Sequence, residues 1–155
     1  MTIAALSDWL LLGHVVAAMV WLGGGVMLAA TALATLRGGD RAALARFVQN
    51  LSVLGPAVLA PAAVLTPALG VWLTLDAAAW GFDQTWVQIA VGLVVVAVAV
   101  GAGHQSRVTL NAQRAIERDD HPEARRQLVR WAWGYAVVVV LLAVIAWDMV
   151  FKPGL

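Results

Sequence analysis

Polar side chains are rare within the long apolar stretches of this sequence, and one histidine and one carboxylic acid are prominent among them. His14 lies near the start of the first apolar stretch, and Asp148 lies near the end of the last one. A polar group inside such a stretch is a candidate functional residue. Imidazole binds haem iron as an axial ligand, and imidazole also suits copper. His14 and Asp148 are therefore the candidate metal ligands of the chain.

The residues that follow His14 at helical spacing leave room for a flat ligand. Ala18, Trp21 and Gly25 come four, seven and eleven positions after His14, so a helix places them on its face, with an indole between two small residues. In the third apolar stretch, Gly92 comes four positions after Gln88, so the two share a similar helix face. We predict a haem b pocket here, with His14 as the axial ligand. Its residues are His14, Ala18, Trp21, Gly25, Gln88 and Gly92.

A second histidine does not complete this haem site, because the depths in the membrane differ. His104 comes 18 positions after Trp86, which corresponds to ~27 Å along a helix. The same rise puts His14 about 8–10 Å from that side of the membrane. We therefore expect no bis-histidine haem. The glycines at 101–103 indicate helix packing, and a lone histidine can also donate to a carbonyl or to Asp148.

Two other functions are compatible with the same residues. One is binding or transport of a metal ion, especially copper, through His14 and Asp148 with the thioethers of Met19 and Met149. The other is a scaffold or subunit role, in which glycine-rich faces pack against a second copy or a larger membrane complex. The sequence holds no serine–histidine–aspartate arrangement, phosphate-binding loop or multi-histidine motif. It therefore favours a protein that is not an enzyme.

The composition indicates that all of these residues belong to an integral membrane protein. The 155 residues are 62% hydrophobic and 12% charged, whereas roughly a quarter of an ordinary soluble domain is charged. A net charge of +1 argues against a nucleic-acid partner. The absence of cysteine excludes disulfides and thiolate metal sites. The expected partner is the lipid bilayer.

Four stretches are long enough to cross a membrane, since about 20 apolar residues span a hydrocarbon core of about 30 Å. Helices are expected because an open strand in lipid would leave backbone groups without hydrogen bonds. We predict an all-α fold, a single four-helix transmembrane domain over 1–155. Its spans cover about 9–36, 51–75, 86–103 and 131–151.

The arginines predict the orientation of these spans. All nine lie between the first and second spans or between the third and fourth, and the connection between the second and third has none. Basic segments stay on the cytoplasmic side. Both termini are therefore predicted outside, in a multi-pass protein of the bacterial inner membrane. The arginines are Arg37, Arg41, Arg46, Arg107, Arg114, Arg118, Arg125, Arg126 and Arg130.

The connections between the spans also have helical patterns. Residues 40–50 form an amphipathic pattern, and 108–117 would extend the third helix beyond the membrane. The fourth helix is predicted to start at Pro122, with Asp120 or His121 as N-cap. Three prolines predict a kinked second span, since each removes a backbone hydrogen bond. They are Pro56, Pro61 and Pro67.

Several segments together resemble one bacterial family. They read GHVVAAMVWLGGGVML (13–28), GPAVLAPAAVLTPALGVWL (55–73), WVQIAVGL (86–93), DHPEARR (120–126) and DMVFKPG (148–154). In these segments, which cover essentially the whole chain, the sequence resembles the predicted integral membrane proteins known as domain of unknown function twenty-two sixty-nine. The resemblance implies a membrane protein and no particular activity.

A shorter similarity concerns the first apolar stretch alone. His14 followed by Trp21-Leu22-Gly23-Gly24 is similar to copper-resistance D-type membrane domains and to the four-helix protoporphyrinogen oxidase of bacteria. In that oxidase family a first-helix histidine is associated with haem and a lysine in the third helix takes part. The third stretch here has no lysine. The similarity therefore implies haem or copper at His14 rather than the oxidase reaction.

Overall fold

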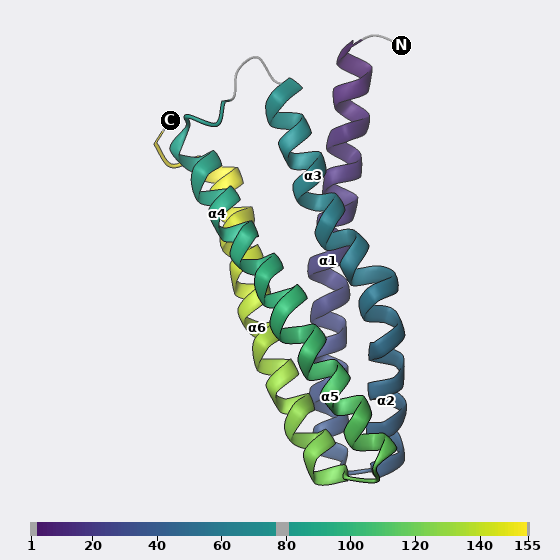
Figure 1. Cartoon of the computed structure of the whole chain (residues 1–155). Helices are drawn as coiled ribbons and strands as arrows, with labels where there is room; N and C mark the ends of the chain where they lie inside the picture. Colours follow the sequence, from purple (N-terminus) through teal and green to yellow (C-terminus); the bar gives the residue numbers. More distant parts are fainter. Residues whose placement is uncertain (1–2, 77–80, 155) are drawn as a thin grey trace.

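The computed structural model describes residues 3–76 and 81–154, and over these ranges the chain is helical, with no strand (Figure 1). Two segments, η1 and η2, are π-helical turns, which are wider than α-helical ones. The elements in order are α1 (Ile3–Gly38), α2 (Arg41–Leu54), η1 (Gly55–Leu59), α3 (Ala60–Asp76), α4 (Thr85–Ala99), η2 (Val100–Gln105), α5 (Ser106–Glu117) and α6 (His121–Phe151).

These elements join into four long helices, because η1 links α2 to α3 and η2 links α4 to α5 without a break. Each is long and apolar enough to cross a membrane. Large apolar side chains such as Met27, Leu75 and Val150 are exposed on the outside of the bundle, where lipid would cover them. The prediction of an all-α integral membrane protein with four spans is confirmed. The four helices cover Leu6–Gly38, Arg41–Asp76, Thr85–Glu117 and His121–Phe151.

The bundle has two distinct ends (Figure 1). The start of α1 and the end of α6 lie at one, which we call the termini end. The α1–α2 and α5–α6 connections lie at the other, the arginine-rich end, because the sequence there carries arginines such as Arg37 and Arg118. That the arginine-rich end faces the cytoplasm stays a prediction from the charge pattern.

Local sequence explains where the helices begin. Asp40 caps α2, because its carboxylate accepts a hydrogen bond from the Ala42 amide at 2.9 Å. Asp120 caps α6 in the same way, accepting from the Glu123 amide at 3.0 Å. The predicted cap of the fourth helix and the predicted extension of the third are confirmed. The amphipathic segment 40–50 is helical as well, but it runs on through η1 into α3.

The helices pack as two pairs. α1 lies along α3, and α4 lies along α6; α1 also contacts α6, whereas α3 and α4 barely touch. At the arginine-rich end, α5 packs against both α6 and α2. α6 contributes a buried stripe at spacings of three and four residues, as a helix in a bundle should. The stripe consists of Leu128, Trp131, Tyr135, Val138, Leu142, Ile145 and Asp148.

Candidate functional site

His14 lies on α1, half-buried against α3. Its Nδ1 is 2.8 Å from the backbone oxygen of Thr66. Gly70, one helical turn further along α3, leaves room for the ring, since a Cβ there would lie 3.1 Å from the His14 Cε1. A carbonyl oxygen can only accept, so Nδ1 carries a proton, and in the neutral imidazole Nε2 then has the lone pair. Metal-bound histidines commonly show this arrangement, with one nitrogen held by a carbonyl and the other facing the metal.

The face of α1 that continues from His14 packs against α6. Trp21 is buried, and its backbone oxygen accepts a hydrogen bond from the Tyr135 hydroxyl at 3.0 Å. The Tyr135 ring occupies the space in front of Gly25, where even a Cβ would clash with it. Ala18 is half-buried. The gap predicted beside Gly25 is thus filled by a side chain of the protein itself.

The two predicted pocket residues of α4 lie elsewhere. Gln88 is exposed, and its amide nitrogen donates to the Phe82 backbone oxygen at 3.0 Å, which ties the start of α4 to the preceding turn. Gly92 is exposed as well, and a Cβ there would meet no other atom within 4 Å. The structure therefore does not bring Gln88 and Gly92 onto the face that carries His14.

Asp148 ends the buried stripe of α6. Its side chain is 1% exposed, and neither carboxylate oxygen has a hydrogen-bond partner among the described residues. His14 donates to α3 instead, so the two candidate metal ligands do not form a hydrogen-bonded pair. The described part of the chain contains no group of three histidine, cysteine, aspartate or glutamate side chains arranged to hold a metal ion.

A cavity of about 420 Å³ lies nearer the arginine-rich end, a feature that the sequence analysis did not predict. One wall comes from α2, η1 and α3, and the opposite wall from α4, η2 and α5. Trp21, Trp131 and Tyr135 also line it. Gly101 and Gly55, one in each π-helical turn, are the sequence signal for this space. In the sequence alone, Gly101 indicates only helix packing.

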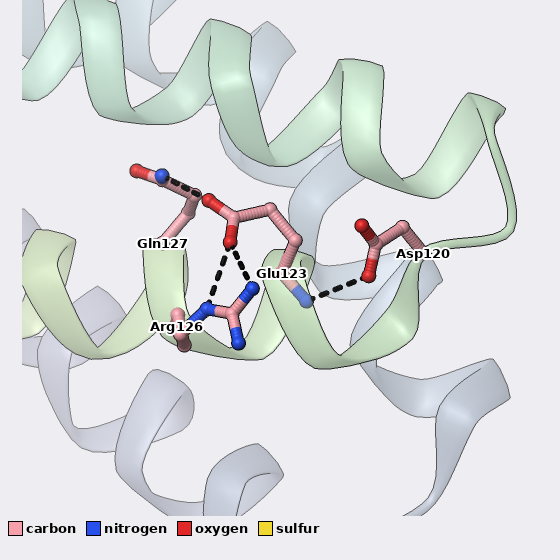
Figure 2. Close-up of polar contacts among 4 residues, drawn as sticks. All are labelled: Asp120, Glu123, Arg126 and Gln127. Carbon is pink, nitrogen blue, oxygen red and sulfur yellow. Dashed lines mark hydrogen bonds and ion pairs between the residues drawn. The ribbon is translucent and has the colours of Figure 1, made fainter.

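The polar residues beyond the cavity form a helix cap (Figure 2). Asp120 accepts from the amide of Glu123, while the Glu123 carboxylate accepts from Gln127 and Arg126. The hydrogen bonds from Gln127 and then Arg126 hold the pKa of Glu123 below its ordinary value. These residues precede the apolar part of α6. They bond to one another, and none of them lines the cavity.

Comparison with known proteins agrees with an integral membrane protein. Residues 8–153 match the model of a family described as "Predicted integral membrane protein (DUF2269)". No curated protein and no solved structure matches the chain.

Proposed function

Because the chain belongs to the DUF2269 family of predicted integral membrane proteins, we propose a function that is exerted within the bilayer, namely binding of haem b through His14. The chain would then be a small cytochrome-like protein that transfers electrons or senses a ligand. The observation that carries this is the contact between His14 Nδ1 and the Thr66 oxygen. It leaves Nε2 as the nitrogen available to an iron.

The surroundings of His14 limit where a porphyrin would lie. Tyr135 fills the space at Gly25, so the α1 residues nearest the haem would be His14 and Ala18. Gln88 and Gly92 face out of the bundle. A role for them in the same pocket requires a second copy of the chain or another membrane subunit. We therefore propose a homo-oligomer or a larger membrane complex as the haem-binding form.

Copper binding is a second candidate, favoured by one observation. Asp148 is buried without a hydrogen-bond partner among the described residues, as expected of a group that receives a ligand. Two protein ligands would leave the remaining positions of the metal to other groups. A scaffold without any cofactor is the third candidate. In each case the expected location is the bacterial inner membrane, with both termini outside, supported by the arginine pattern.

The test is a visible absorption spectrum of the full chain purified in mild detergent, oxidised and then reduced with dithionite. We expect a Soret band, with α and β bands after reduction. His14→Ala should abolish these bands, whereas the control His104→Ala should retain them, because His104 is exposed on η2.

Three results would contradict the haem assignment. A flat spectrum from cells with ample haem would remove it. Equal loss of the bands in both histidine variants would show that His14 is not the specific ligand. Stoichiometric copper without porphyrin bands, reduced in Asp148→Asn, would favour the copper candidate instead.

A further inference from the structure

The cavity near the arginine-rich end has the properties of a ligand site, and it is separate from His14, which does not line it. Its volume of about 420 Å³ falls within the range of small-molecule pockets, roughly 300–1,000 Å³. Both walls include a π-helical turn, η1 on one side and η2 on the other. Single π-helical turns within α-helices occur frequently at functional sites.

One polar group in the cavity wall lacks a partner. Gln105 is 7% exposed, and its Nε2 donates to the Trp131 backbone oxygen at 3.1 Å. Only the amide nitrogen can donate to a carbonyl, so this bond also identifies Oε1, which is buried with no hydrogen-bond partner among the described residues. A buried acceptor of this kind is rarely left unpaired. A ligand with a hydrogen-bond donor would satisfy this oxygen once the Gln105 amide turns it toward the cavity.

A second acceptor lies in the same wall. The Tyr135 hydroxyl gives its proton to the Trp21 backbone oxygen at 3.0 Å. Its oxygen can then only accept from a ligand. Gln105 and Tyr135 both line the cavity and are buried, and each offers an oxygen that can accept a hydrogen bond.

The rest of the wall favours a ring. Trp131 and Tyr135 stack on each other with centroids 5.2 Å apart and an interplanar angle of 24°. Phe47 supports Trp131 from its edge at 6.4 Å. The wall is otherwise mainly apolar, and two of its residues, Val64 and Leu110, are 63% and 50% exposed. In a bilayer these side chains meet lipid, so a lipid-soluble compound can reach the cavity from the membrane.

We propose that this cavity binds a lipid-soluble hydroquinone, with a ring hydroxyl donating to Gln105 Oε1. Hydroquinones combine an apolar ring, which aromatic side chains accommodate, with hydroxyl donors at opposite positions of the ring. The oxidised quinone has carbonyl oxygens there and leaves Gln105 unpaired. A lipid acyl chain fills apolar space but also offers no donor. The site should therefore prefer the reduced compound.

The test is calorimetric titration of the detergent-solubilised full chain with a short-chain benzoquinol under anaerobic conditions, and separately with its quinone. We expect the quinol to bind more tightly, by about tenfold, the size of one hydrogen bond at the upper end of its usual net value. Gln105→Leu keeps the approximate size of the side chain and removes the acceptor, together with the amide nitrogen that donates to the Trp131 oxygen. It should abolish that preference by weakening quinol binding.

A matched pair of glycine variants tests the location. A Cβ at Gly101 or at Gly103 would meet no other atom within 4 Å, and both glycines belong to η2, but only Gly101 lines the cavity. Gly101→Leu should reduce quinol affinity by more than tenfold, and Gly103→Leu should leave it unchanged.

Two results would overturn the assignment. Equal affinity for quinol and quinone that Gln105→Leu does not alter would show an apolar occupant such as lipid. Quinol binding that persists in Gly101→Leu would place it elsewhere. Neither readout depends on haem, because a chain without a Soret band can still bind quinol in this cavity.

Discussion

The two ends of the bundle differ in how their polar groups are satisfied. At the termini end, His14 bonds to the α3 backbone and Gln88 to the turn before α4, while Thr74 bonds to the Gly70 oxygen of its own helix. Towards the arginine-rich end, a cavity with an unpaired glutamine oxygen lies between the helices. Among the described residues of the termini end, these polar side chains therefore bond to separate backbone groups, and the buried Asp148 has no hydrogen-bond partner.

This difference shows what a rare polar residue in a membrane helix does and does not indicate. Such a residue is a side chain that needs a hydrogen-bond partner. A backbone carbonyl of a neighbouring helix can be that partner, as the Thr66 oxygen is for His14. A binding cavity, in contrast, arises where two helices fail to fill the space between them. Small residues and π-helical turns produce such space, but they do not form a distinctive pattern in a sequence.

Among the variants that test the difference between the two ends, Gly25→Ala should cause the largest loss of stability. Gly25 and Tyr135 join α1 to α6, and a Cβ at Gly25 would clash with the Tyr135 ring. Inserting a methyl group into a packed core typically costs about 1–3 kcal/mol. We expect a loss of that size in stability, measured as thermal unfolding in detergent.

Gly23→Ala is the control for this change. It lies two residues earlier on the same helix, where a Cβ would meet no other atom within 4 Å. Its stability should stay at or above that of the wild type, because alanine favours helix more than glycine does. A Gly25→Ala protein as stable as Gly23→Ala would mean that the two helices are not in tight contact there.

Asp120→Ala should cause an intermediate loss of stability, confined to the arginine-rich end. The loss of an N-cap typically costs about 1 kcal/mol. Hydrogen exchange should increase in the first turns of α6, at the amides of residues 121–127, and remain unchanged at the termini end. Asp120→Asn should behave like the wild type, since asparagine caps equally well. Faster exchange at both ends would show that the ends are not independent.

The smallest effect is expected from Tyr135→Phe, which removes the hydroxyl that donates to the Trp21 backbone oxygen. Hydrogen bonds between membrane helices average about 0.6 kcal/mol. The thermal midpoint should fall slightly. Thr31→Val should change it less, because the Thr31 hydroxyl is exposed and bonds only within α1, at 2.8 Å to the Met27 oxygen. A larger fall for Thr31→Val would contradict the inferred link between α1 and α6.

The fold could be predicted from the sequence because its determinants are local. The length of an apolar stretch dictates a membrane-crossing helix, and the cap at Asp120 depends on residues only three positions apart. The site could not be predicted in the same way. Whether Gly25 faces a ligand or a side chain depends on Tyr135, which lies 110 positions later in the chain.

The cavity could not be predicted from the sequence for a related reason. Its walls combine Gly55 with Gly101 and Trp131, three residues from separate long helices. No pattern within one stretch brings them together. The continuous helix from α2 into α3 could not be predicted as a unit either, because the pattern changes from amphipathic in 40–50 to apolar in 51–75. In the structure α2 runs across this change, and the Gly55-Pro56 pair lies in a π-helical turn.

The π-helical turn η2 changes the phase of the helix that contains it. Buried residues of this helix recur at intervals of seven before the turn, from Ala90 to Ala97, and after it, from Gln105 to Ala112. Across the turn, the interval from Ala97 to Gln105 is eight. One residue in an α-helix corresponds to about 100° of rotation. A strict heptad numbering that starts in α4 would therefore assign Gln105 to an outer face, and the extra residue is what turns its amide inward.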